Sequence, residues 1–585
     1  MSNTDVKTIP ELLQRSVNDY ADQPALSFVD GAPLSFSDVD FLTRRLGVGL
    51  ASLGVKPGDH VAILAENMPN WGAAYLTISR IGAVIVPILP DFTSAEVVNI
   101  LKHAEVQTVF VSEKQFPKLA ELQQSGIVQA VLLDSLILIP RDIELSKDNA
   151  LPSLAEHAVA AELATGNADD IAEPEIDPSS TAAIIYTSGT TGNSKGVMLS
   201  HTNIVSNVEA SRQIPDIEAG QSMLSLLPLS HTYECTLGFL VPLASGACVY
   251  YLGKPPSPSV LMPALQKIRP HLMLSVPLFI EKIFRARVLP QLTGSFVMRM
   301  MYRIRPIQKV LHKAAGRKVY ALFGGRLHFF GVGGAALAPD VELFLRDAGF
   351  PYAIGYGLTE TSPLVAGSGP KHTVFKAIGP VLDRVQVRLD MAAGGDSDEG
   401  EVQVLGPNVM LGYYKDQEYT REVFTEDGWF RTGDIGYLDS NGVLSIRGRI
   451  KNMILGSSGE NIYPEQIEAV INEKPYIEES LVTQQDDKLV AMVYLNYEAL
   501  LEHVAAMRGN IKDWHSEIQD NIKDSSEQIK AGVSKFKQDI DAYLNETRKK
   551  VNDELSVFSR IAAVIPRDEP FEKTPTMKIK RYLYT

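Results

Sequence analysis

The amino-acid sequence predicts an α/β protein: a large N-terminal body of layered sheets and helices with a β subdomain, followed by a small α+β C-terminal lobe. Three observations lead to this prediction. Short apolar runs alternate with segments of helical periodicity in the first part of the chain, which is typical of a parallel sheet covered by helices. Residues 385–404 alternate in polarity around a turn-rich connection, as antiparallel strands do. From Arg449 onward the chain has strands and helices of its own.

The bulk composition favours an ordinary globular protein. Its 585 residues are 45% hydrophobic and 21% charged, and the net charge of −15 argues against general nucleic-acid binding. Cys235 and Cys248 cannot form a disulfide framework and lack the spacing of metal ligands, which indicates a reducing, cytosolic setting. The N-terminus lacks signal-peptide features. The most apolar region, residues 224–252, is broken by polar residues and prolines, so any membrane contact is expected to be peripheral.

The N-terminal body is expected to begin with helical and strand segments in alternation. Residues 12–54 have helical apolar spacing. The expected elements after them are a strand at 61–64, a helix at 71–82, and strands at 84–87 and 109–111.

The stretch 186–196 is a candidate polyphosphate-binding loop, reached through an acidic, alanine-rich connection at 142–178 and a short strand at 182–185. Its glycines let the backbone approach a ligand closely, and hydroxyls and one ammonium without any carboxylate suit a polyphosphate. It is not a Walker A loop, because Lys195 does not directly follow the last loop glycine. A solvated loop is the alternative interpretation. The candidate residues are Thr187, Ser188, Gly189, Thr190, Thr191, Gly192 and Lys195.

A basic stripe follows in the middle of the chain. No acidic residue lies between Glu281 and Asp340, and six cations fall mostly four apart, so they share one side of a helix that Pro306 must start or kink. Apolar surface beside them is supplied by Met298, Met300, Met301, Ile304 and Leu311. A basic amphipathic helix in an acidic protein favours membrane-surface contact, and a solvated face is the alternative. The six cations are Arg299, Arg303, Arg305, Lys309, Lys313 and Arg317.

Later segments add two strand-to-turn units and a long helical region. Residues 329–335 and 353–357 each read as a strand that runs into a glycine turn, and the second delivers Thr359 and Glu360. Residues 442–446 supply another strand. Over about residues 498–556, apolar residues recur every three or four positions, which predicts an amphipathic helix or helical hairpin. Its apolar face has two interpretations: it packs on the C-terminal lobe, or it mediates self-association as a homodimer.

Five motifs in order resemble those of the AMP-forming adenylation superfamily, and the chain is most similar to its long-chain fatty acyl-CoA synthetases. The motifs are the loop at 187–196, Gly355–Thr361, Arg431–Asp434, Gly448–Lys451 and Lys573–Lys578. The resemblance implies ATP-dependent activation of a fatty, long-chain carboxylic acid to acyl-AMP with release of pyrophosphate, followed by transfer to the thiol of CoA. It also implies Mg²⁺, and a body of residues 1–448 joined to a mobile lobe of residues 449–585.

The resemblance also implies roles for individual residues. Lys578, Thr187 and Glu360 would be catalytic, with Glu360 as the Mg²⁺ ligand and Lys578 bridging the carboxylate and the α-phosphate. Thr359 would touch the α-phosphate, and Asp434 and Arg449 would hold the ribose. The remaining nucleotide-binding positions are the phosphate-loop residues named above together with Gly333, Gly334, Gly355, Tyr356 and Gly357.

The acyl pocket and the joint are implied in the same way. Tyr233 would gate the acyl pocket, and His231 would contact the bound substrate in its ground state. The alternative for His231 is a histidine that caps a helix and has its hydrogen bonds satisfied. Lys451 would be the hinge. The path of the thiol would be lined by Gly456, Ser458, Gly459 and Glu460.

The chain departs from the family pattern at four places, and three alternative functions stay open. Ser194 replaces a proline, Asn452 replaces an acid, Met577 replaces a glycine, and the helical region at 498–556 is longer than in many members. An acyl-acyl carrier protein synthetase and a luciferase-like oxidation share the first chemical step. A catalytically silent relative should have lost Glu360, Asp434 or Lys578, and all three are present. Acyl chain length and oligomeric state are not predicted.

Overall fold

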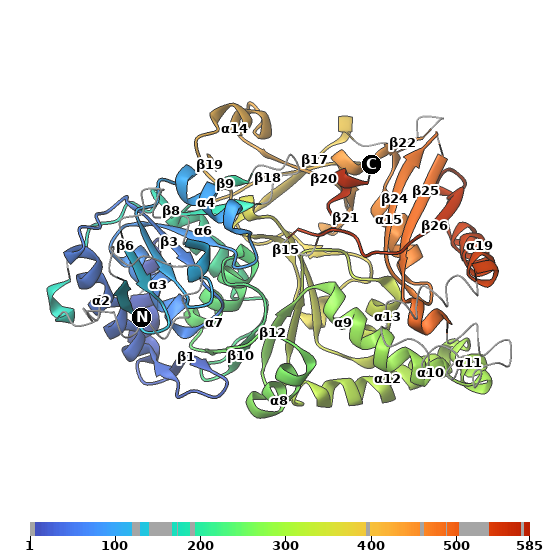
Figure 1. Ribbon diagram of the computed structural model, residues 1–585, viewed down its shortest axis with the longest axis horizontal. Helices are drawn as coiled ribbons and strands as arrows, with labels where there is room; N and C mark the ends of the chain where they lie inside the picture. The colour runs from blue at the N-terminus through green and yellow to red at the C-terminus, as the bar shows by residue number, and fades with distance from the viewer. Residues whose placement is uncertain are drawn as a thin grey trace.

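The computed structural model describes residues 6–119, 129–139, 167–171, 173–187, 194–393, 398–456, 461–486, 488–501, 537–574 and 578–584 (Figure 1). The body contains two eight-stranded sheets and a five-stranded sheet, and the C-terminal lobe packs beside them with its own sheet and helices. The mixed α/β class predicted from the sequence is confirmed.

The first sheet has the order β15-β14-β13-β12-β10-β11-β1-β2 and is parallel from β14 to β1. Its strands are β1 (Pro24–Phe28), β2 (Leu34–Ser35), β10 (Ser222–Ser225), β11 (Cys248–Tyr251), β12 (Leu272–Ser275), β13 (Phe329–Val332), β14 (Tyr352–Gly357) and β15 (Leu364–Gly367). Parallel strands place their carboxyl ends at one edge, where ligands bind in open α/β sheets. The glycine turns after β13 and within β14 lie at this edge.

The second sheet has the order β19-β9-β8-β4-β3-β5-β6-β7. Its strands are β3 (His60–Leu64), β4 (Val84–Ile88), β5 (Thr108–Val111), β6 (Gln129–Leu132), β7 (Ile137–Ile139), β8 (Thr181–Thr187), β9 (Lys195–Ser200) and β19 (Gly412–Tyr413). β8 and β9 pair antiparallel with Thr187 opposite Lys195, so the predicted phosphate loop connects the two strands of a hairpin. Residues 188–193 of this loop lie outside the described residues.

Helices cover these two sheets, and several of them begin at strong capping sequences. Four helices begin with a capping box, in which the cap side chain accepts the N–H of the third helical residue and that residue's side chain accepts the N–H of the cap. The capping residues are Thr8, Ser35, Thr93 and Ser200. The helices of the body are α1 (Ile9–Tyr20), α2 (Phe36–Ser52), α3 (Pro69–Arg80), α4 (Ser94–His103), α6 (His201–Ser211), η4 (Glu234–Leu240), α7 (Val241–Ala244), α8 (Pro258–Ile268), α9 (Pro277–Ile283), η5 (Phe284–Val288), α10 (Leu289–Thr293), α11 (Phe296–Tyr302), α12 (Arg305–Leu322), α13 (Pro339–Ala348) and α14 (Gln417–Val423).

Two local predictions are corrected by these bounds. The helical spacing at residues 12–54 is interrupted by β1 and β2, because the residues between α1 and α2 include a buried strand that pairs with β11. The basic stripe does not lie on one helix, since α11 ends at Tyr302 and α12 begins at Arg305. Pro306 stands in the first turn of α12, where its missing N–H costs no hydrogen bond, so it starts the helix and does not kink it.

The β subdomain is the predicted antiparallel unit. Its five strands have the order β16-β21-β20-β18-β17, and β17 pairs antiparallel with β18 through five residue pairs. The strands are β16 (Gly379–Pro380), β17 (Gln386–Asp390), β18 (Glu399–Leu405), β20 (Phe430–Leu438) and β21 (Val443–Arg449). Arg449 is therefore the last residue of a body strand, and the lobe's own elements begin after it.

In its described residues, the C-terminal lobe has a three-stranded sheet, a two-stranded sheet and helices beside them, at the orange and red end of the ribbon (Figure 1). Its elements are η9 (Ile450–Asn452), β22 (Ile454–Leu455), β23 (Asn461–Ile462), α15 (Pro464–Asn472), β24 (Ile477–Gln485), β25 (Lys488–Leu495), α19 (Lys537–Glu554) and β26 (Ala563–Arg567). Ile540, Leu544 and Val551 of α19 are buried in the lobe's core, as expected if this part of the helical region packs on the lobe. Residues 502–536 lie outside the described residues.

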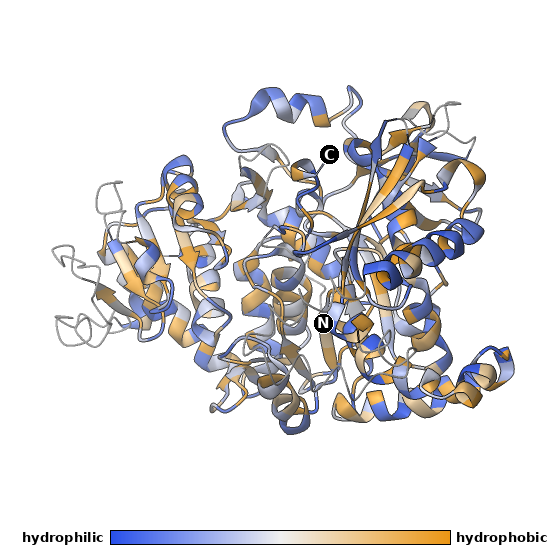
Figure 2. Ribbon diagram, turned by 45° about the vertical axis from the view of Figure 1, so that its right-hand side comes forward, coloured by the Kyte–Doolittle hydropathy of each residue, from blue (hydrophilic) through white to orange (hydrophobic). Residues whose placement is uncertain are grey.

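Hydrophobic residues gather in the sheets, whereas the outer helices contain both hydrophobic and hydrophilic residues (Figure 2). The two body sheets share buried clusters with the helices between them, and the lobe has a separate core. Within the described part of the chain, no helix is both long and apolar enough to cross a bilayer.

Candidate active site

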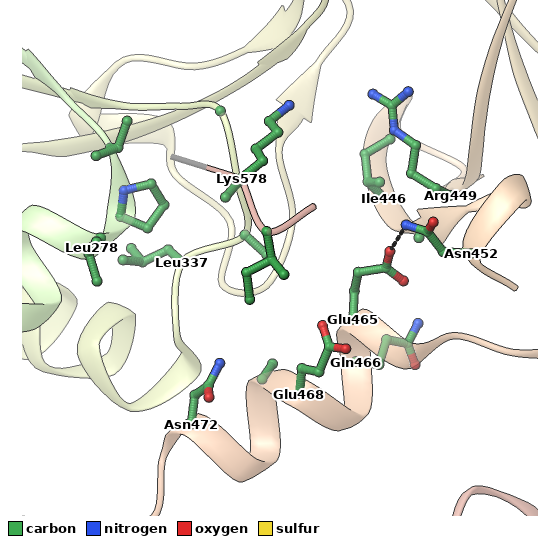
Figure 3. A pocket seen from close by; sticks show the side chains of 18 of the residues that line it. Leu278, Leu337, Ile446, Arg449, Asn452, Glu465, Gln466, Glu468, Asn472 and Lys578 are labelled. Atoms are coloured by element: carbon green, nitrogen blue, oxygen red, sulfur yellow. Dashed lines mark hydrogen bonds between the residues drawn. The ribbon is translucent and has the colours of Figure 1, made fainter. Parts of the chain in front are cut away.

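One cavity of about 4050 Å³ lies between the body and the C-terminal lobe. The edge of the first sheet, the β8–β9 hairpin, the β subdomain and the lobe all contribute to its walls. Figure 3 shows Lys578 projecting into it between Leu278 and Leu337 on one side and Arg449 on the other. Most of the predicted site residues that are described therefore border a single space.

The predicted ribose-binding residues form a connected group. Asp434 and Arg449 lie opposite each other on β20 and β21, and Arg449 Nε is 2.7 Å from Asp434 Oδ1. The hydroxyl of Tyr356, on β14, donates to Asp434 Oδ2 at 2.7 Å. Burial raises the pKa of Asp434, and the guanidinium of Arg449 opposes that rise. The carboxylate is thus held in one orientation by two elements, with lone pairs remaining for a ligand.

The phosphate side of the site brings Thr187, Lys195 and Glu360 together. Thr187 ends β8 and Lys195 begins β9, directly opposite it. Glu360 lies in the short helix η6 (Thr359–Thr361) and accepts a hydrogen bond at Oε1 from the hydroxyl of Tyr413 at 2.8 Å. Ser188, Gly189, Thr190, Thr191 and Gly192 lie outside the described residues, so their predicted roles stay predictions.

The carboxylate of Glu360 is chemically suited to bind Mg²⁺. This carboxylate lines the cavity, and no described residue donates to its second oxygen, Oε2. No group of three or more His, Cys, Asp or Glu residues that could hold a metal alone occurs in the described chain. Mg²⁺ commonly binds through one or two carboxylates together with substrate phosphates, so one carboxylate beside a phosphate loop suits this ion.

Lys578 reaches the site from the lobe. Thr574 N–H donates to Lys578 O at 2.7 Å, and the neighbouring Lys573 forms an ion pair with Glu479 of the lobe. Crowding by protein atoms lowers the pKa of Lys578, and the positive charge of Arg449 lowers it further, whereas Asp434 and Glu360 raise it. The ammonium therefore stands among the groups predicted to bind the nucleotide. Met577 lies outside the described residues.

His231 and Tyr233 lie at the same cavity, between β10 and η4. The Tyr233 ring packs against the glycine turn after β13: a Cβ on Gly333 would lie 3.0 Å from its Cζ. Gly333 therefore makes room for this ring, and Gly334, with φ of +88°, turns the chain away. His231 Nδ1 accepts the Tyr233 N–H at 3.2 Å, which is the capping arrangement, yet the ring also borders the cavity. Burial lowers the pKa of His231 to about 4, so the imidazole is neutral.

The predicted hinge lies where the body meets the lobe. Lys451 is exposed in η9, and the next residue, Asn452, donates to Glu465 Oε1 of α15 at 2.6 Å (Figure 3). Asn452 stands where the motif of the resembled family often has an acidic residue, and its amide binds a carboxylate of the lobe. Gly456 follows β22. Ser458, Gly459 and Glu460 lie outside the described residues.

The basic stripe touches the same cavity, because Arg299 and Arg303 are among its lining residues. Arg305 differs from the prediction: it pairs with Asp347 at 2.6 Å, which also contacts His312, so its charge is neutralised within the body. The other five cations form no ion pair within the described chain. Large apolar side chains stand exposed beside them, namely Phe296 (72% exposed), Val297 (64%) and Val310 (66%).

Sequence reasoning missed two tyrosines of the site, Tyr413 and Tyr419. Tyr413 contacts Glu360, and the Lys195 ammonium lies 3.0 Å from the centre of the Tyr419 ring. The only local signal was Gly412 before Tyr413, where φ is +141° and a Cβ would lie 2.7 Å from Thr420. Such a glycine marks a close approach but does not reveal what the next side chain contacts.

Comparisons with known proteins show which family this chain resembles in sequence. The model of the family described as AMP-binding enzyme matches residues 13–414. Long-chain-fatty-acid–CoA ligase FadD15 of Mycobacterium bovis is 29% identical over 92% of this chain and 88% of its own length. Long-chain-fatty-acid–[acyl-carrier-protein] ligase AEE15 of Arabidopsis thaliana is 27% identical over 85% of this chain and 77% of its own length.

The fold has solved counterparts. The crystal structure of ATP-bound MatB from Rhodopseudomonas palustris superposes with a TM-score of 0.71 at 22% identity, covering 98% of both chains. The family model spans more than half of this sequence, and the motifs that it covers border one cavity. The chain therefore belongs to the family of AMP-binding enzymes.

Proposed function

We propose that this protein activates a fatty, long-chain carboxylic acid with ATP to an acyl-adenylate, and then transfers the acyl group to the thiol of CoA. The observation that carries the proposal is the position of Lys578. Its ammonium comes from the lobe, yet it lies in one cavity with Asp434, Arg449 and Glu360 of the body. A cation brought to the point where a carboxylate would meet a phosphate is what the first step requires.

The first step joins two anions. A carboxylate oxygen attacks the α-phosphorus of ATP, the bond between the α-phosphorus and the bridging oxygen breaks, and pyrophosphate leaves. Lys578 offsets the negative charge on the carboxylate and the α-phosphate, which positioned cations do best in a preorganised site. Asp434 and Arg449 hold the ribose, and Thr187, Lys195 and the loop between them hold the outer phosphates. Bound Mg²⁺ would neutralise phosphate charge from the side of Glu360.

The second step needs a thiol. Its sulfur attacks the acyl carbon, the bond from that carbon to the phosphate oxygen breaks, and AMP leaves. Gly456, Ser458, Gly459 and Glu460 would border the path of the thiol once the lobe has turned about Lys451. Small residues leave room for a narrow pantetheine arm.

The acyl chain would lie beyond Tyr233, against aliphatic residues of the cavity wall. Val276, Leu278, Leu289 and Leu337 are among the aliphatic residues that line the cavity. Apolar walls bind an alkyl chain by removing it from water, in proportion to the area covered. Neutral His231 would contact the carboxylate end without adding a competing charge.

One assay tests this function: pyrophosphate release with fatty acids of increasing chain length, with CoA, with holo-acyl carrier protein, or with neither thiol. We expect release to depend on a long-chain acid, and steady turnover to require CoA. Turnover only with the carrier protein would identify the acyl-acyl carrier protein alternative. Failure of every fatty acid to support release would reject the proposed substrate class.

The proposal includes peripheral contact with the inner face of the cytoplasmic membrane. We name as the basic–apolar surface the exposed residues Phe296, Val297, Arg299, Arg303, Lys309, Val310 and Lys313. It combines cations that have no ion pair in the described chain with exposed apolar side chains, which is the composition of an interfacial segment. Arg299 and Arg303 also line the cavity, so a lipid-dissolved acid would meet the surface close to the site.

Neutralising this surface should abolish membrane binding. Each cation near an anionic surface contributes about 1 kcal/mol, screened by salt. Changing Arg299, Arg303, Lys309 and Lys313 together to glutamine should therefore remove co-sedimentation with anionic vesicles and leave activity on micellar substrate nearly intact. A matched variant with Lys56, Lys254, Lys488 and Lys549 changed to glutamine loses the same charge elsewhere and should still sediment. Equal vesicle binding by the two variants would show that the basic stripe is an ordinary solvated surface with no part in membrane binding.

A further inference from the structure

Two described side chains of opposite charge line the active-site cavity. Lys195 and Glu360 both line the cavity, yet the described residues contain no ion pair between them. Each is held by a tyrosine instead. The Lys195 ammonium lies 3.0 Å from the centre of the Tyr419 ring and 5.6 Å from that of Tyr413, and Tyr413 donates its hydroxyl to Glu360.

The two tyrosines are placed by their own backbone and by each other. Tyr413 N–H donates to Thr420 Oγ1 at 2.9 Å, and Tyr419 N–H donates to the capping Asp416 Oδ1 at 3.0 Å. The rings lie 5.0 Å apart between centres at 37°. β19 pairs with β9 so that Tyr413 lies opposite Val197, near Lys195 on the same strand. Tyr413 is therefore held by β19 against the strand that follows the phosphate loop, and Tyr419 lies in the helix α14 that comes soon after it in the chain.

Both contacts suit the charges that they hold. The face of an aromatic ring attracts a cation through its quadrupole, and this attraction grows when water is excluded. The hydroxyl of Tyr413 donates to the Glu360 carboxylate at 2.8 Å, and a hydrogen bond to an ionised acceptor is stronger than one between neutral groups. Without these partners, an ammonium and a carboxylate in one cavity would attract each other directly, and a ligand would first have to separate them.

We propose that Tyr413 and Tyr419 are positioning residues that keep Glu360 and Lys195 apart and open toward a polyphosphate carrying a divalent cation. Tyr413 aims the carboxylate at the cation, and Tyr419 seats the ammonium where the outer phosphates arrive. This inference rests on the proposed use of ATP. It assigns the two tyrosines to binding of the triphosphate and its metal, and gives them no part in binding the nucleoside.

Equilibrium binding of ATP and of AMP, each with and without Mg²⁺ and without fatty acid, tests this inference independently of turnover. Tyr413→Phe removes only the hydroxyl and should weaken ATP binding in Mg²⁺ by about tenfold, as expected for one hydrogen bond to a charged group. Its effect should be smaller without Mg²⁺. Tyr419→Leu removes the ring and should weaken ATP binding by about fivefold with or without Mg²⁺. AMP binding should change by less than about twofold in both variants, because AMP lacks the outer phosphates.

Two further variants separate positioning from folding. Tyr414→Phe also removes a tyrosine hydroxyl, but the Tyr414 ring packs against His60 and His103. This variant should bind ATP as tightly as the parent protein does. When Lys195 is also changed to methionine, the ammonium that could pair with Glu360 is gone. Each tyrosine substitution should then weaken ATP binding less than it does in the parent protein. Loss of AMP and ATP binding to the same degree, or parental ATP binding by Tyr413→Phe and Tyr419→Leu, would overturn the proposal. Failure of the parent protein to bind ATP would instead reject the proposed function.

Discussion

Replacing Lys578 with alanine should slow adenylation by about 10²–10³-fold, the loss that follows removal of one group that stabilises developing charge. The side chain comes from the lobe and stands beside Asp434, Arg449 and Glu360. Without it, the carboxylate and the α-phosphate meet with no cation between them. Acyl-AMP that is synthesised chemically should still be converted to acyl-CoA, because thiol attack does not bring two anions together. Pyrophosphate release and thioester formation, measured separately, check this prediction.

The matched control is Lys580→Ala. Lys580 lies two residues after Lys578, and its ammonium is 3.7 Å from Glu572, a largely exposed partner. This variant should keep both half-reactions, since exposed ion pairs contribute little. The pH profile adds a second check: the lowered pKa of Lys578 means that adenylation should decline at a less alkaline pH than an ordinary lysine would cause. Equal loss of both half-reactions in Lys578→Ala would make Lys578 a structural residue.

Replacing Lys451 with proline should have the opposite selectivity and stall the enzyme after adenylation. Lys451 is exposed in the first turn of η9, where the fixed φ near −65° of proline and its missing N–H are tolerated. In the present arrangement Lys578 already lies in the cavity, so adenylation should continue. Rotation of the lobe requires large torsion changes at few residues, and proline restricts those torsions.

The expected result is a thioester step slowed by about tenfold or more, with acyl-AMP accumulating on the protein. Rapid quench with labelled fatty acid measures both species in one experiment. Lys451→Ala removes the same side chain but leaves the backbone free, and should form acyl-CoA at close to the parental rate. If Lys451→Pro and Lys451→Ala behave alike, the joint does not lie at this residue.

The sequence alone determined the fold class and the identity of the chemical groups. Short-range patterns decide where strands and helices form, which is why β8, β13 and β14 and the antiparallel β17–β18 pair were predicted close to their observed bounds. The motifs also identified Asp434, Arg449, Glu360 and Lys578 as chemically suited to a nucleotide site. These predictions could be made from the sequence because residue type and local spacing carry the information that they need.

Only the tertiary structure decided which of these groups meet. Asp347 removes Arg305 from the basic stripe, and Tyr356 holds Asp434 across two sheets. Tyr413 and Tyr419 hold Glu360 and Lys195, although neither belongs to a motif quoted from the sequence. Periodicity reports which face of an element is buried but not which distant side chain lies opposite it, because that depends on how separate sheets and the lobe pack together.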